Sequence, residues 1–252
     1  MHSYFPAMLN TPERQTTVPA ITYFFFAFFI FPFVGVLFTF DESQMLYGAW
    51  IDILYHLCNF LVAGIIFLPY LKESFQQIMF EGKLFWSTVG ICSAAVIVFK
   101  LILFMISYFI GEQLFFSSAL GSLLTSEMDL QYLSTFLALE QPIWGTLVLV
   151  LICPIAISCL FYGCVFNPIA YKRPWLGYVA TVATLVLLRG LMIFCFWDPS
   201  QQIALFFITL PVHLIACLSY HITDTIWAPI AVHSISNAVL ALLTHLVLTP
   251  ML

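Results

Sequence analysis

The sequence predicts an all-α membrane protein: a polytopic bundle of about seven transmembrane helices, with one further helix in the membrane interface. Of its residues, 63% are hydrophobic and only 8% are charged, and the mean hydropathy is +1.06. Soluble globular domains are about half apolar and about one quarter charged. The composition therefore excludes a soluble domain, and we expect residues 1–252 to form a single integral membrane domain.

Apolar stretches of about 20 residues, the length at which a helix crosses a bilayer, define the predicted spans. They cover 18–40, 47–71, 84–110, 143–167, 175–197, 201–222 and 226–249. Charged or proline-containing breaks separate most neighbours, and the six tryptophans fall near predicted span ends, where indole rings favour the headgroup region. The long connection 111–141 contains a capping-box pattern at Ser126, which predicts an amphipathic interfacial helix.

The positions of lysine and arginine predict how the protein is oriented in the membrane. If the spans alternate in direction, the lysines and arginines outside the spans all fall on the side of the N-terminus: Arg14, Lys72, Lys83, Lys172 and Arg173. Because cytoplasmic loops are enriched in lysine and arginine, we expect a cytoplasmic N-terminus and an external C-terminus. The net charge of −5 includes no basic stripe, so we expect the lipid bilayer rather than nucleic acid as a partner.

Two cationic side chains lie deep within predicted spans. Lys100 belongs to the third span and Arg189 to the fifth. A charge at the centre of the bilayer costs about 2.5–3.5 kcal/mol on an insertion scale, so each of them needs a partner or a function. For Lys100 we expect a structural pairing with Asp52 or a side chain that extends to the surface. Arg189 is the stronger functional candidate.

One pair of polar residues stands out in the last span. His233 and Asn237 are four residues apart, so they lie on the same face of a helix. The remaining histidines of the spans are scattered, and we expect them to be core or interfacial residues: His56, His213, His221 and His245. Neither a Cys-x-x-Cys pair nor a His-Glu-x-x-His motif is present, so no metal site is predicted.

Residues 223–237 read Thr-Asp-Thr-Ile-Trp-Ala-Pro-Ile-Ala-Val-His-Ser-Ile-Ser-Asn. This stretch resembles the last signature of the CPBP family, the CAAX proteases and bacteriocin-processing enzymes that are also called Abi proteins. The family consists of multi-spanning helical membrane proteins, and many of its members are intramembrane endopeptidases. The resemblance places the family core at 143–249 and implies a location in the bacterial cytoplasmic membrane.

At the positions of the other two family signatures, the surrounding sequence matches the family but the functional residues are replaced. The first signature, Glu-Glu-x-x-x-Arg, falls on Ile157, Ser158 and Tyr162, so both carboxylates and the arginine are replaced. The second signature, Phe-x-x-x-His, falls on Leu185 and Arg189. The resemblance therefore implies the fold of the family but not its full set of catalytic groups.

The matched residues define a candidate pocket. At about 1.5 Å of rise per helical residue, Ser158, Arg189 and His233 are expected roughly 10–20 Å from the cytoplasmic face. Residues at similar depth on three helices can share one pocket, to which Tyr162 and Asn237 would also belong. Lys100 and Arg189 would supply its intramembrane charge.

The pocket lacks the groups that peptide hydrolysis needs. In the mechanism that the resemblance implies, a glutamate activates water, and Ile157 and Ser158 offer no such base. A catalytic zinc takes about three protein ligands, and His233 alone does not supply them. No residue is therefore assigned as catalytic and no cofactor is expected, although zinc would enter with an active protease. Two other hypotheses stay open: Glu140 as the base, although it is expected near the opposite membrane face, and Ser158 as a nucleophile activated by His233.

These observations favour a non-catalytic pseudoprotease that binds a peptide or membrane-protein partner, a role that the resemblance to a family with bacteriocin-immunity members implies. The guanidinium of Arg189 offers five donors in a fixed fork, which suits an anion, with His233 and Asn237 beside it. The alternative for Arg189 is an internal bridge to backbone carbonyls and Asn237. Two alternative functions remain: an active CAAX-type endopeptidase with an unusual site, and a subunit of a membrane transport complex.

Overall fold

The computed structural model describes residues 22, 45–110, 142–170, 173–194 and 199–248, which are helical apart from short turns and contain no strand. The helical segments are α3 (Met45–Ile110), α6 (Pro142–Leu147), η4 (Val148–Ile152), α7 (Cys153–Ile157), η5 (Ser158–Phe166), α8 (Asn167–Ala170), α9 (Pro174–Phe194), α10 (Pro199–Thr223) and α11 (Trp227–Leu248). The predicted all-α class is confirmed. The first predicted span, 18–40, and the predicted interfacial helix within 111–141 lie outside the described residues.

Four helical stretches of the described chain are long and apolar enough to cross a membrane. They are Leu57–Gln76, Gly82–Leu103, Gly145–Ala170 and Phe206–Thr223, and the shorter apolar stretch Pro174–Gly190 accompanies them. The protein is therefore an integral, multi-pass membrane protein. Which end of the bundle faces the cytoplasm remains the prediction made from lysine and arginine.

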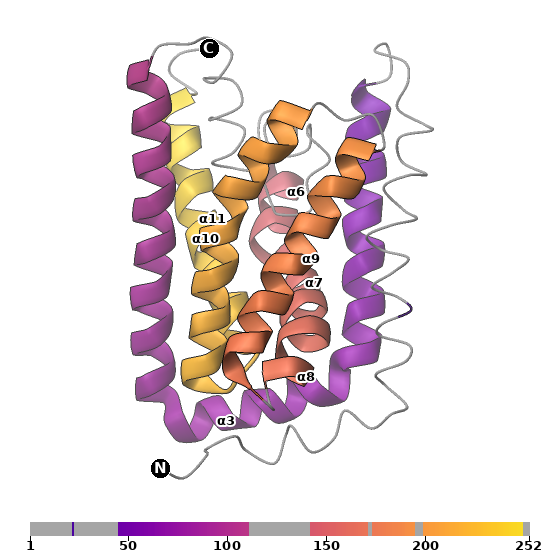
Figure 1. Ribbon diagram of the computed structural model, residues 1–252, viewed down its shortest axis with the longest axis vertical. Coiled ribbons are helices and arrows are strands. Elements are labelled where there is room, and N and C mark those ends of the chain that lie inside the picture. Colours follow the sequence, from indigo (N-terminus) through magenta and orange to yellow (C-terminus); the bar gives the residue numbers. More distant parts are fainter. Residues whose placement is uncertain (1–21, 23–44, 111–141, 171–172, 195–198, 249–252) are drawn as a thin grey trace.

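Helix α3 forms two arms on opposite sides of the bundle, joined by a stretch that crosses one end of the molecule (Figure 1). The sequence predicted two spans here, 47–71 and 84–110, and the structure joins them through a helical stretch. The connecting stretch is rich in Leu, Lys, Glu, Gln and Met, which favour helix, so the chain stays helical while it changes direction. Pro69 lies within the helix, where the loss of one backbone hydrogen bond permits a bend.

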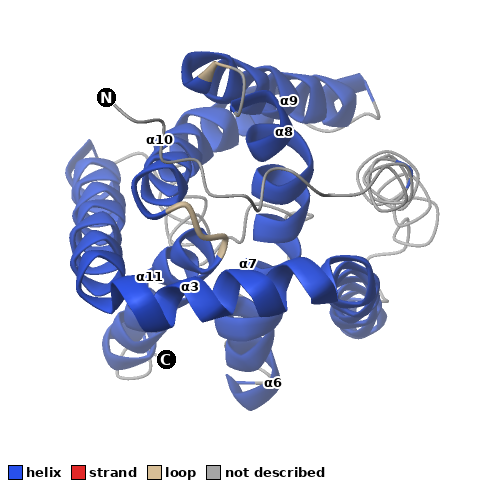
Figure 2. Ribbon diagram, turned by 90° about the horizontal axis from the view of Figure 1, so that it is seen from below, coloured by secondary structure: helices blue, strands red, loops and turns tan. Residues whose placement is uncertain are grey.

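Hydrogen bonds fasten the bend of α3 to the turn between α10 and α11. The indole N–H of Trp227 donates to the carbonyl of Leu71 at 2.9 Å. The hydroxyls of Ser74 and Thr225 lie 3.1 Å apart, and the backbone N–H of Ile226 donates to the Ser74 hydroxyl. Seen from below, α3 accordingly crosses the bundle along its α7 and α11 side (Figure 2).

The predicted span 143–167 is one helical rod that contains two π-helical stretches, η4 and η5. The N–H of Cys153 donates to the carbonyl of Val148 and the N–H of Asn167 to that of Tyr162, five residues back in each case. In each case the residue that donates the bond is followed directly by a proline, Pro154 or Pro168. Because a proline ring lacks an N–H and clashes with the carbonyl four residues back, a wider turn relieves both problems.

The core of the bundle lies where this rod meets the bend of α3, α9, α10 and the start of α11. Two glycines allow the close approach. A Cβ atom on Gly163 would lie 2.8 Å from the ring of Phe67, and one on Gly177 would lie 2.7 Å from the Cβ of Ala170. The core therefore tolerates no larger residue at these two positions without movement of its neighbours.

Candidate functional site

Tyr162 lies at the centre of the candidate site. Its side chain is completely buried in the middle of η5. Its hydroxyl lies 3.0 Å from Nδ1 of His213 on α10 and 3.1 Å from Nε2 of His233 on α11. One phenol therefore connects three helices that lie far apart in the sequence.

The chemistry of these three groups explains why they are stable inside the bundle. A phenol has one proton to donate and accepts further bonds, whereas a neutral imidazole has one donor and one acceptor nitrogen. The Tyr162 hydroxyl therefore donates to one ring and accepts from the other. Aromatic contacts hold the rings in place: Tyr162 and His233 stack at 17°, and Phe161 lies 4.5 Å from His213 between ring centres.

Two cationic side chains flank this centre. Lys100 of α3 and Arg189 of α9 are both buried, with exposed fractions of 6% and 9%. Lys100 lies within electrostatic range of His233, and Arg189 lies within electrostatic range of His213. The charge of Lys100 therefore acts on one imidazole of this centre and the charge of Arg189 on the other. The side chain of Asp52, the partner proposed for Lys100, lies outside the described part of the chain.

The other two candidate residues of the pocket have different roles. The amide of Asn237 donates to the carbonyl of Leu149 at 3.0 Å and so ties α11 to η4. Ser158 is fully buried one turn before Tyr162, and its hydroxyl has no hydrogen-bond partner among the described residues. The structure thus brings Tyr162 and His233 into contact, while Asn237 joins two helices.

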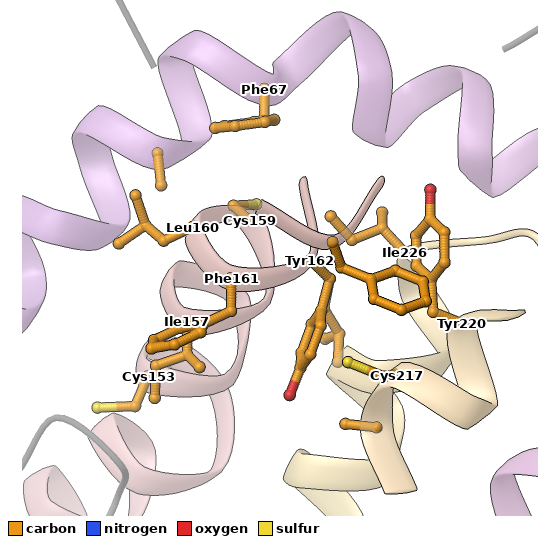
Figure 3. Close-up of a cluster of buried hydrophobic side chains, with 14 of the residues drawn as sticks. Phe67, Cys153, Ile157, Cys159, Leu160, Phe161, Tyr162, Cys217, Tyr220 and Ile226 are labelled. Carbon is orange, nitrogen blue, oxygen red and sulfur yellow. The ribbon is translucent and has the colours of Figure 1, made fainter. Parts of the chain in front are cut away.

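A second polar cluster separates this site from the bend of α3. The hydroxyls of Tyr70 and Tyr220 lie 2.6 Å apart. The side-chain amide nitrogen of Asn167 donates to the Tyr70 hydroxyl at 3.5 Å. Figure 3 shows the hydroxyls of Tyr162 and Tyr220 pointing in opposite directions, that of Tyr220 toward α3 and that of Tyr162 into the bundle. The Tyr162 site therefore lies behind a layer of buried aromatic rings.

Two acidic side chains are placed in the part of the chain that the structure describes. The acidic side chains that it places are Glu73, exposed in the bend of α3, and Asp224, in the turn before α11. No three His, Cys, Asp or Glu side chains of the described residues lie together as metal ligands would. Glu140, the alternative base, lies outside the described residues.

His213 is the site residue that the sequence analysis missed. It was grouped with the scattered histidines because no motif surrounds it. A signal was nevertheless present: His213 lies ten residues before the end of α10 at Thr223, which corresponds to a depth of roughly 15 Å. This is the depth range predicted for His233 and Arg189, and depth alone would have grouped the three residues.

One family model matches part of the chain. Residues 139–239 match the family described as Rce1-like, type II CAAX prenyl endopeptidase. The matched segment runs from just before α6 into α11 and contains Tyr162, Arg189, His213 and His233. No curated protein and no solved structure gives a significant match. Residues 139–239 are therefore similar to CAAX-protease-type membrane proteins, the same family that residues 223–237 resemble.

Proposed function

We propose that this protein is a non-catalytic member of its family, which binds a peptide or membrane-protein partner without cutting it. The observation that carries the proposal is the identity of the residues at the positions of the first family signature. Ile157 and Ser158 stand in the two glutamate positions, and both are buried inside the bundle. Tyr162 replaces the arginine of that signature and holds both imidazoles.

The site is poorly suited to activate water. A general base needs a free proton-accepting atom within reach of the water and a suitable pKa. The facing nitrogens of His213 and His233 are both directed at the Tyr162 hydroxyl, and two cations lie beside them. Positive charge favours a bound anion over the protonated imidazole that general-base catalysis would produce.

The family match itself favours a second candidate, an active CAAX-type endopeptidase with an unusual site. The two buried cations favour a third, a subunit of a transport complex in which Lys100 and Arg189 line a path. For all three functions we propose a location in a bacterial cytoplasmic membrane, with the N-terminus in the cytoplasm.

Cleavage and binding measured on one sample separate the first two candidates. The purified protein in lipid nanodiscs is mixed with a fluorescent, prenylated CAAX peptide, and an active endopeptidase of the family serves as the positive control. We expect saturable binding by fluorescence anisotropy and no shortened product by mass spectrometry. A shortened product that disappears in the His233→Ala variant would establish the active enzyme instead.

A further inference from the structure

We propose that the crossing segment of α3, residues 68–86, lies along the surface of the bilayer and binds anionic lipid there. Phe75 and Met79 insert among the acyl chains, and Lys72 and Lys83 bind the headgroups. This surface lies outside the Tyr162 site and outside the segment that matches the family model, so the inference does not depend on the proposed function.

The exposed face of the crossing segment divides into two strips. Because a helix turns by about 100° per residue, side chains at intervals of four or seven residues lie within about 40° of one another. The apolar strip consists of exposed side chains at such intervals: Leu68, Phe75, Met79 and Trp86. The polar strip lies about 60° round the helix from it and also consists of exposed side chains: Lys72, Gln76 and Lys83. A boundary between apolar and polar surface therefore runs along the segment.

The opposite face of the segment is fixed to the bundle. Leu71 and Ser74 are buried there. The Leu71 carbonyl accepts from the indole N–H of Trp227, and the Ser74 hydroxyl lies 3.1 Å from that of Thr225. Phe85 is buried on the same face near the other end of the segment. These contacts set the rotation of the helix, so the apolar strip stays on the outside of the folded protein.

Continuity with a membrane-spanning arm identifies what covers the apolar strip. The segment joins the two arms of α3 across one end of the bundle (Figure 1). In the first arm, Leu61 and Ile65 continue the same helix face and are exposed within the span Leu57–Gln76, where they face acyl chains. Met79 is 78% exposed and Phe75 is 52% exposed, which is unfavourable in water. The apolar strip is therefore covered by the bilayer that surrounds the arm.

Charge complementarity identifies the headgroup. Lys72 and Lys83 lie next to the apolar strip, so their methylene stems run along it while the ammonium groups reach the headgroup region. Glu73 is exposed about 100° from Lys72, on the side away from the apolar strip. Among the described side chains of the segment, the charges beside the apolar strip are thus positive. Helices with this pattern, lysine beside exposed aromatic and aliphatic residues, bind the surface of anionic membranes.

The first test maps which positions contact acyl chains. The photoreactive amino acid p-benzoylphenylalanine is placed at position 75, 79 or 76 of the full-length protein, reconstituted in vesicles of phosphatidylcholine and phosphatidylglycerol. Gln76 is the matched control, because it is exposed beside Phe75 in the chain but belongs to the polar strip. After illumination, tandem mass spectrometry locates any attached lipid. We expect acyl-chain adducts at positions 75 and 79 to exceed those at position 76 several-fold.

Two results of this test would overturn the bilayer-surface placement. One is an equal yield of acyl-chain adducts at the three positions, or none at all. The other is crosslinking of positions 75 and 79 to a second protein chain in place of lipid, because a protein interface would then cover the apolar strip.

The second test measures the choice of headgroup. Native mass spectrometry of the full-length protein, released from the same vesicles, compares retained phosphatidylglycerol with retained phosphatidylcholine. Because a lysine near an anionic surface contributes a factor of about five in binding, we expect the preference for phosphatidylglycerol to fall about fivefold in Lys72→Gln and again in the double variant with Lys83→Gln. Lys72→Arg and Lys83→Arg keep the charge and are expected to keep the preference. No preference in the unaltered protein, or an unchanged preference in the double glutamine variant, would overturn the anionic-lipid site.

Discussion

The hydroxyl of Tyr162 lies 3.1 Å from Nε2 of His233 and joins η5 to α11 through one buried contact. In the register proposed from the sequence, Tyr162 takes the place of the arginine of the first family signature. A second imidazole, that of His213, completes it from α10. The site is thus a hydrogen-bonded centre that links η5, α10 and α11.

Removal of this hydroxyl is expected to destabilise the bundle. In Tyr162→Phe the facing imidazole nitrogens lose their shared partner within the core, and we expect a loss of about 1–3 kcal/mol in the free energy of unfolding. Tyr178→Phe is the matched control, because Tyr178 forms one hydrogen bond, to His221, at a partly buried position. Denaturation in detergent micelles followed by circular dichroism measures both, and equal losses would contradict the central role of Tyr162.

Asn237 is expected to act as a structural link between helices. In Asn237→Ala the bond from the amide to the Leu149 carbonyl is lost, and bonds of this kind between membrane helices contribute about 0.6 kcal/mol on average. Ser236→Ala is the control, because the Ser236 hydroxyl bonds only to carbonyls of its own helix, those of Val232 and His233. The free energy of unfolding of the two variants decides the point, and an unchanged stability of Asn237→Ala would refute this role.

Two glycines of α9 are expected to respond in opposite directions to the same substitution. A Cβ atom at Gly177 would lie 2.7 Å from Ala170 and 2.9 Å from the ring of Phe166, so Gly177→Ala overpacks the junction and should cost about 1–3 kcal/mol. A Cβ atom at Gly190 meets nothing within 4 Å, and Gly190→Ala should be neutral or stabilise the helix by up to about 1 kcal/mol. Thermal unfolding of both variants tests the packing of α8 against α9. Equal shifts in the melting temperatures of the two variants would contradict this packing.

The bend of α3 is expected to couple energetically to the start of α11. Ser74→Ala and Thr225→Val each remove the contact between their hydroxyls, so the double variant should lose less stability than the two single losses combined. Coupling energies between membrane helices average about 0.6 kcal/mol and reach about 1.7 kcal/mol. A double-mutant cycle on unfolding free energies measures this coupling. Strictly additive losses would mean that the bend does not depend on this contact.

The ends of the last three long helices were predicted closely from sequence. The expected spans 175–197, 201–222 and 226–249 correspond to Pro174–Phe194, Pro199–Thr223 and Trp227–Leu248. Proline begins two of these helices and the turn at Asp224, which has a positive φ of 53°, precedes the third. These are local signals, encoded in a few neighbouring residues.

The features that sequence reasoning missed depend on contacts between distant segments. The helical bend of α3 is held by Trp227 and Thr225, more than 150 positions later in the chain. His213 carries no motif and enters the site only because α10 packs against η5. The π-helical turns had a local signal in Pro154 and Pro168, but the span was expected as regular α-helix because apolar periodicity does not distinguish the two.

The most direct test of the central claim is a high-resolution density map of the protein in lipid, read around the hydroxyl of Tyr162. We predict that the Tyr162 hydroxyl joins His213 and His233 and that no metal lies between the two imidazoles. Tetrahedral metal density coordinated by His213 and His233 would contradict the account and restore a hydrolytic site.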